Sequence, residues 1–292
     1  MDTLATAFKE QIKQAVSLAK VSTVITPDNV YQEGNADILP VVDSMADALL
    51  LPGSGVDGME YLEELLAKAE TGKSCLLLLE HYSNMDLTLF SLLVRRAGGR
   101  GEQINKAVVA IAGMKLNEDN PVVAAFASAY TRVVIYPIRS LEGLDAENDK
   151  EEIIRSNAIN RAAMKKLDKL KTQGKLVLIF PTGTRYRPWD PSTKKGVREI
   201  DGYLRSYDYM CLIAINGEVL HVQETDMMND AVSKDIVRIT AGPVLSCAEF
   251  RNKARNEAQA AGIADKKQAA VDAIITELNL MHDKAEKKRE NP

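Results

Sequence analysis

The chain has 292 residues, of which 46% are hydrophobic and 27% are charged, and its formal net charge is -4. A chain of this length can bury a sizeable core and is within the range of one large α/β domain. The mild net charge gives no strong overall attraction to nucleic acid or to an anionic membrane surface, so we do not expect nucleic acid as a partner.

The first fifty residues are predicted to form a helical N-terminal segment, and residues 51–292 to form an α/β domain. Apolar side chains recur at helical spacing in this segment, at Leu4, Phe8, Ile12 and Val16. The stretch "LPGSGVDG", residues 51–58, is predicted to be a loop at the seam between the two parts.

Neither a signal peptide nor a membrane span is predicted. The N-terminal stretch "MDTLATAFKEQIKQAVSLAK" carries charges throughout and lacks an apolar central region. The longest apolar run, near "PVVAAFASAY", is well short of the roughly 20 residues that a spanning helix needs. We therefore expect a cytoplasmic protein, and any contact with a membrane to be peripheral.

From residue 59 onward, predicted helices and predicted strands alternate. The helices are expected at residues 59–73, 86–99, 120–130, 150–174 and 264–288. The strands are short and apolar, and are expected at residues 74–79, 106–113, 132–138, 175–180, 209–217 and 236–245. This alternation indicates an α/β fold whose central sheet is largely parallel and covered by helices.

The cysteines and histidines show no metal-binding pattern. Cys75, Cys211 and Cys247 are far apart, and the first two lie inside apolar runs. This predicts buried, reduced thiols of an intracellular protein rather than a disulfide or a metal site. With no paired cysteines and with the histidines also far apart, we expect no metal.

One predicted strand runs directly into the polar stretch "EHYSNMD". In an α/β sheet, ligands bind at the carboxyl ends of the strands. An Asp86 carboxylate that accepts an N–H of His81 would fix the ring tautomer and leave the other nitrogen free as a base. Such a pair can deprotonate the hydroxyl of a substrate. The alternative is that Asp86 only supports the N-terminus of the next helix and His81 is a packed loop residue.

A second strand end carries "PTGTRYRP", in which Gly183 stands close to Arg185 and Arg187. In an extended segment, side chains two residues apart point to the same side, and arginine guanidinium groups suit phosphate. The alternative is a solvated turn in which the arginines pack on Trp189. A base beside a phosphate clamp suggests a phosphorylated alcohol presented to an activated acyl or phosphoryl donor.

A second basic cluster follows the helix after His81 and contains Arg95, Arg96, Arg100 and Lys106. These side chains could receive the phosphates of coenzyme A or an acidic acyl carrier protein. The alternative is an ordinary solvated helix end, since cations favour helix C-termini.

Three blocks together resemble those of the glycerolipid acyltransferases: "HYSNMD", "VVIYPIRS" and "FPTGTR". The order and spacing agree with that family from about Met59 to Asn216. The resemblance implies transfer of a fatty acyl group from a thioester to the hydroxyl of glycerol-3-phosphate or lysophosphatidate. It also implies that His81 is the general base, Asp86 its orienting partner and Arg185 a phosphate ligand.

Within that family the chain looks most like the soluble, plastid-type glycerol-3-phosphate acyltransferases, because "TGTRYRPWDPSTKKG" has a second arginine and a Pro…Asp-Pro-Ser-Thr run. This resemblance adds Arg187 to the phosphate site and gives Arg139 the role of the basic group of the middle block. Thr182 replaces the glutamate of the commoner third block, and only about fifty residues stand in place of a larger helical N-terminal domain.

These features predict a glycerol-3-phosphate acyltransferase of phospholipid synthesis that needs no cofactor beyond acyl-CoA or acyl carrier protein as co-substrate. A lysophosphatidate acyltransferase is an alternative with the same chemistry on a larger acceptor. An acyl-thioester hydrolase or a non-catalytic phospholipid-binding relative is a more distant alternative. A serine hydrolase would need a Gly-x-Ser-x-Gly elbow, which the sequence lacks.

Overall fold

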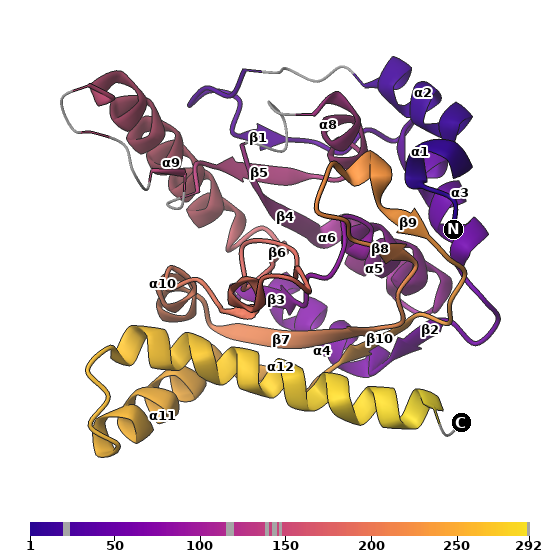
Figure 1. The fold of residues 1–292 in the computed structure, drawn as a ribbon. Coiled ribbons are helices and arrows are strands. Elements are labelled where there is room, and N and C mark those ends of the chain that lie inside the picture. The colour runs from indigo at the N-terminus through magenta and orange to yellow at the C-terminus, as the bar shows by residue number, and fades with distance from the viewer. Residues whose placement is uncertain (20–23, 115–119, 138–139, 142–144, 146–147, 291–292) are drawn as a thin grey trace. The chain divides into compact units, whose positions relative to one another are not determined.

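The computed structural model describes residues 1–19, 24–114, 120–137, 140–141, 145 and 148–290 (Figure 1). The chain divides into two compact units. The first unit consists of Met1–Ala7, Ala46–Val108 and Lys171–Pro292, and the second of Phe8–Met45 and Val109–Leu170. The predicted division into residues 1–50 and 51–292 remains a prediction.

The strands of the first unit are hydrogen-bonded in the order β6 (Leu176–Ile179), β3 (Cys75–Leu79), β7 (Tyr209–Asn216), β10 (Arg238–Ala241) and β2 (Gly55–Asp57). Strand β3 is parallel to both neighbours, with Leu78 opposite Ile179 on one side and Leu212 on the other. All five residues of β3 are buried, as expected for a strand that helices cover. Its carboxyl end is therefore held rigidly.

The helices of the first unit include α12 (Lys266–Glu290), which runs beside β7 and β10 (Figure 1). Its apolar residues Val271, Ile274 and Leu278 are buried, so this helix docks on the core. The other helices are α1 (Leu4–Ala7), α4 (Met59–Glu70), α5 (Asp86–Arg96), α6 (Gly101–Ala107), α10 (Ile200–Ser206), α11 (Cys247–Ala260) and the 3-10 turns η2 (Pro191–Lys194) and η3 (Met227–Asn229). Strands β8 (Leu220–His221) and β9 (Ala231–Val232) form a separate antiparallel pair.

The second unit contains β4 (Val108–Gly113) and β5 (Arg132–Ile135), which are parallel, and β1 (Tyr31–Gln32), which is antiparallel to β5. Helix α9 (Lys150–Leu170) contacts β5, and α2 (Lys9–Leu18) contacts α8 (Pro121–Ala127). The boundary between the two units, at Met45 and Ala46, falls within helix α3 (Leu39–Leu49).

The α/β fold class, with a largely parallel sheet flanked by helices, is confirmed. Two local expectations were wrong. The strand predicted at residues 236–245 is interrupted at Gly242-Pro243, where proline has no N–H for the ladder, and continues as β11 (Leu245–Ser246). Both pieces pair antiparallel with β7, so this edge of the sheet is mixed. The predicted loop at residues 51–58 contains β2, which pairs with β10.

Candidate active site

The segment that follows β3 is folded around the carboxylate of Asp86. One oxygen, Oδ2, accepts the backbone N–H groups of Tyr82 at 2.6 Å and Ser83 at 2.8 Å. The other oxygen accepts the hydroxyl of Ser83 at 2.8 Å. A carboxylate in the first turn of a helix is also stabilised by the helix dipole. Asp86 therefore holds the segment between β3 and α5 in one defined conformation.

The same oxygen of Asp86 lies 2.9 Å from Nδ1 of His81. The carboxylate is an acceptor, so the imidazole carries its proton at Nδ1 and presents Nε2 as the basic nitrogen. None of the described residues hydrogen-bonds to Nε2. The side chain of Asp86 is only 3% exposed, and that of His81 is 17% exposed. The pair predicted from sequence is thus brought into direct contact.

The side chain of His81 is packed and largely shielded from solvent. Its ring stacks on Phe180, with 4.0 Å between the ring centroids and 21° between the planes. Phe180 directly follows β6, which is the neighbour of β3 in the sheet. Replacing His81 will therefore remove packing as well as a base.

The "FPTGTR" block forms a compact turn beside the histidine. The N–H of Gly183 donates to the carbonyl of Phe180 at 2.9 Å, and Gly183 has a positive φ of 65°, which glycine adopts without strain. The N–H of Tyr186 donates to the carbonyl of His81 at 2.8 Å. The predicted blocks around His81 and Gly183 are therefore joined by their backbones.

The two arginines of this block have different surroundings. Nη1 of Arg185 lies 2.8 Å from Oδ2 of Asp230, and the Asp230 side chain is fully buried. Burial raises the pKa of Asp230, while the N–H of Gln223 and the charge of Arg185 act in the opposite direction. By contrast, the guanidinium of Arg187 has no ion-pair partner among the described residues. Arg185 and Arg187, which the sequence places side by side, are therefore not equivalent, because only Arg185 is paired with a carboxylate among the described residues.

Lys194 is a cation at this site that sequence reasoning missed. Its Nζ lies 4.7 Å from the ring centre of Tyr186 and 5.8 Å from that of Tyr82. In the described part of the chain, no carboxylate forms an ion pair with it. Lysine over aromatic rings is held by a cation–π interaction that leaves its charge available. The sequence signal was the basic pair in "DPSTKKG", close behind Arg187.

The arginines predicted to bind the acyl donor each contact a different residue of the protein. Nη1 of Arg96 is 2.6 Å from Asp47, Arg100 pairs with Glu70, and Nε of Arg95 donates to the carbonyl of Ser91. Arg96 also lines a cavity of about 550 Å³, together with Leu50, Leu51, Val56, Met59 and Arg238. Arg139, the predicted basic residue of the middle block, lies outside the described residues.

Within the described residues, no group of three or more His, Cys, Asp or Glu side chains is placed to hold a metal ion. Cys75, Cys211 and Cys247 are free and buried, as predicted for structural thiols. Burial raises the pKa of each of these thiols to about 12. No helix in the described parts of the chain combines the length and apolar character that a bilayer crossing requires.

The family model described as Acyltransferase matches residues 55–246. This range includes the His81–Asp86 pair and the block from Phe180 to Arg187. The chain therefore belongs to the Acyltransferase family, and the transfer of an acyl group is its class of reaction. A comparison with curated proteins finds no match.

Proposed function

We propose that the protein transfers a fatty acyl group from a thioester, acyl-CoA or acyl carrier protein, to a hydroxyl of glycerol-3-phosphate in phospholipid synthesis. The observation that carries this proposal is the 2.9 Å contact between His81 and Asp86 at the carboxyl end of β3. The cations Arg187 and Lys194 belong to the segment that is hydrogen-bonded to the backbone of His81. A base close to two cations without ion-pair partners among the described residues suits a phosphorylated alcohol as the acceptor.

In the proposed reaction, Nε2 of His81 removes the proton of the glycerol hydroxyl as the oxygen attacks the thioester carbonyl. Collapse of the tetrahedral intermediate breaks the C–S bond, and the imidazolium returns the proton to the leaving thiolate. Asp86 stabilises the imidazolium while it exists. The N–H of Gly183 already donates to Phe180, so other N–H groups must stabilise the oxyanion in this conformation. The thioester is the activated donor, and we propose no further cofactor.

We place the acceptor phosphate at Arg187, with Lys194 as a second positive charge. Arg185 remains ion-paired with buried Asp230 and contributes to the shape of the site. Glycerol-3-phosphate has no acyl chain to bury, so electrostatic contacts must supply most of its binding energy. The phosphate then fixes the hydroxyl in reach of the base, which is a large source of rate enhancement.

Replacing Arg187 with alanine should raise the KM for glycerol-3-phosphate about tenfold or more, because a charged hydrogen bond contributes about 1.5–3 kcal/mol. The KM for the acyl thioester and the Tm should change little. Steady-state kinetics with each substrate varied in turn, and a thermal melt, make these measurements. The control is Lys195→Ala, which removes an exposed positive charge next to Lys194. A rise in the donor KM instead would assign Arg187 to the coenzyme or carrier phosphates.

Arg185→Ala should behave differently from Arg187→Ala. It leaves the buried carboxylate of Asp230 without its cation, which typically costs about 3–5 kcal/mol. A lower Tm should therefore accompany any change in KM. If Arg185→Ala raises the acceptor KM at an unchanged Tm, Arg185 rather than Arg187 is the principal phosphate ligand.

The acceptor is tested by comparing glycerol-3-phosphate with lysophosphatidate, using one acyl thioester in detergent-free buffer below the micellar range. We expect kcat/KM to be at least about tenfold higher for glycerol-3-phosphate, a difference of ~1.4 kcal/mol in transition-state binding. Equal or better use of lysophosphatidate would overturn the choice of acceptor and leave acyl transfer intact. Thioester cleavage that does not depend on an acceptor would indicate a hydrolase.

A further inference from the structure

Each of the three histidines of the chain faces a carboxylate. His81 faces Asp86 at 2.9 Å, His221 faces Glu218 at 3.3 Å, and His282 faces Glu80 at 3.0 Å. The His221 pair is a surface contact, because the side chain of Glu218 is 58% exposed. The side chain of Glu80 is only 6% exposed, and Glu80 is the residue immediately before His81. This third pair therefore joins α12 to the segment that carries the proposed base.

Glu80 is a buried hub at the carboxyl end of β3. Its Oε2 accepts the backbone N–H of Ile215 at 2.8 Å in addition to the contact with Nδ1 of His282. Its Oε1 accepts the hydroxyl of Tyr82 at 3.2 Å. Hydrogen bonds to a buried carboxylate are strong and directional. The carboxylate of Glu80 thus fixes the chain on either side of His81, with partners on β7, on α12 and within the loop.

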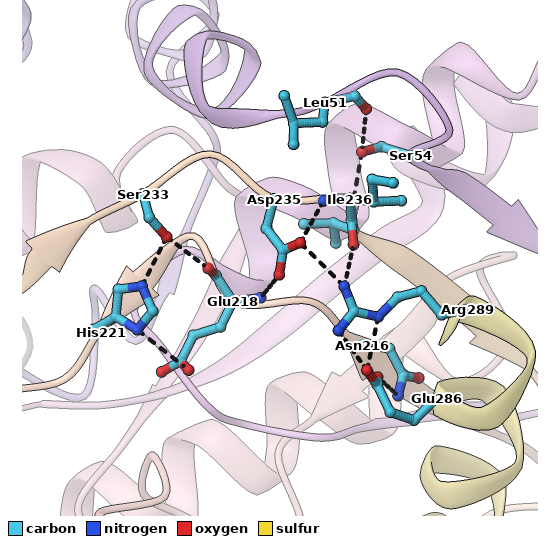
Figure 2. A network of polar contacts seen from close by, with 11 residues as sticks. Leu51, Ser54, Asn216, Glu218, His221, Ser233, Asp235, Ile236, Glu286 and Arg289 are labelled. Carbon is cyan, nitrogen blue, oxygen red and sulfur yellow. Dashed lines mark hydrogen bonds and ion pairs between the residues drawn. The ribbon is translucent and has the colours of Figure 1, made fainter. Parts of the chain in front are cut away.

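Hydrogen bonds from the end of β7 also hold helix α12 near His282, so the position of His282 is well defined. Nδ2 of Asn216, at the end of β7, donates to the carbonyl of His282 at 3.1 Å and to Glu286 at 2.7 Å. Figure 2 shows how Glu286 then accepts from Arg289, which also reaches Asp235 at 3.0 Å. The same view shows the separate contact of His221 with Glu218 and Ser233.

We propose that His282 is a positioning residue for the acyl-transfer reaction: through Glu80 it holds the segment from Glu80 to Asp86 so that His81 meets the acceptor hydroxyl. This inference rests on the proposed function of His81 as the general base. A displacement of about 1 Å in a catalytic group can cost up to about 10²-fold in rate. A histidine about 200 residues away in sequence thereby contributes to turnover without touching the substrate.

The charges around His282 favour its protonated form. Burial alone would lower the pKa of the imidazole, but the hydrogen bond and charge of Glu80, joined by the charge of Glu286, outweigh it. The pKa of His282 therefore lies above its ordinary value of 6.5, and the charge of Lys194 acts in the opposite direction. The hydroxyl of Tyr82 lies 3.4 Å from Nδ1, and the N–H of Asn216 meets the backbone carbonyl. When His282 is protonated, the contact with Glu80 is a charged hydrogen bond.

The test compares His282→Ala, His282→Asn and the control His221→Asn by steady-state kinetics. We expect His282→Ala to lower kcat about tenfold, with the KM for both substrates within about twofold of the wild type. The side-chain amide of asparagine can occupy the place of Nδ1, so His282→Asn should recover most of kcat. His221→Asn should match the wild type. A kcat of His282→Ala equal to that of the wild type would overturn the proposal.

Hydrogen exchange supplies a readout that does not depend on activity. The amides of Tyr82 and Ser83 donate to Asp86, and they should exchange about tenfold faster in His282→Ala than in the wild type or in His221→Asn. Unchanged exchange would overturn the proposal whatever the value of kcat. If the wild-type protein transfers no acyl group to any acceptor, the proposed function fails, and the exchange rates alone decide whether His282 holds the segment.

The pH dependence of stability gives a third readout with a definite sign. Because the pKa of His282 is raised in the native state, its charged contact stabilises the fold fully below about pH 6.5 and is lost as the pH rises through the raised pKa. The difference in Tm between the wild type and His282→Asn should therefore shrink between about pH 6 and about pH 9. A difference that grows over this range would contradict a charged pair.

Discussion

Replacing His81 with alanine is expected to lower kcat for acyl transfer by at least about 10²-fold, because a general base typically contributes about 10²–10⁴-fold. Nδ1 of His81 is fixed by Asp86, and Nε2 is the nitrogen that would accept the hydroxyl proton. The KM values should change much less than kcat, because the base acts on the transition state. Initial rates with an acyl thioester and glycerol-3-phosphate measure this effect.

Two further variants separate chemistry from packing. His81 stacks on Phe180, so alanine also opens a space and is expected to lower the Tm. His81→Gln keeps most of the bulk without the base, and its kcat should fall nearly as far as that of alanine. His221→Ala removes a histidine that pairs with exposed Glu218 and not with Asp86 or Glu80, and its kcat should stay at the wild-type level. Near-full turnover by His81→Gln would exclude His81 as the base.

The contacts that sequence reasoning found are local ones. The His81–Asp86 contact spans five residues. An acid in the first turn of a helix that follows a strand lies close to the loop between them, so its carboxylate is directed toward that loop. The α/β class followed from short apolar strands that alternate with helices. In both cases the physical cause acts between residues that are close in sequence or through a regular pattern of apolar residues.

The contacts that sequence reasoning missed join residues that are far apart. Asp230 reaches Arg185 across 45 residues, and His282 reaches Glu80 across 202. No local pattern marks either partner, because each depends on how strands and helices pack. Helix α11 was a different kind of omission: Ser246 accepts the N–H of Glu249 at 3.3 Å, and Ser-x-x-Glu before a helix is a readable capping signal.

Asp86→Asn is expected to lower kcat by at least about 10²-fold while leaving His81 in place. The backbone N–H groups of Tyr82 and Ser83 require an acceptor in the place of Oδ2, so the amide oxygen of asparagine occupies it and the ring proton stays on Nδ1. The amide nitrogen then faces the hydroxyl of Ser83 and weakens that contact. The carboxylate charge that stabilises the imidazolium is lost.

The matched control for Asp86→Asn is Ser83→Ala. This variant removes the 2.8 Å hydrogen bond between the Ser83 hydroxyl and Oδ1 of Asp86 but keeps the carboxylate, its contact with His81 and the backbone N–H bonds. A hydrogen bond to a charged group contributes about 1.5–3 kcal/mol, so both variants should lower the Tm. Only Asp86→Asn should lower kcat by two orders of magnitude or more, because only it removes the charge that stabilises the imidazolium of His81. If Ser83→Ala lowers kcat as far as Asp86→Asn does, then Asp86 acts by shaping the loop and not by orienting the base.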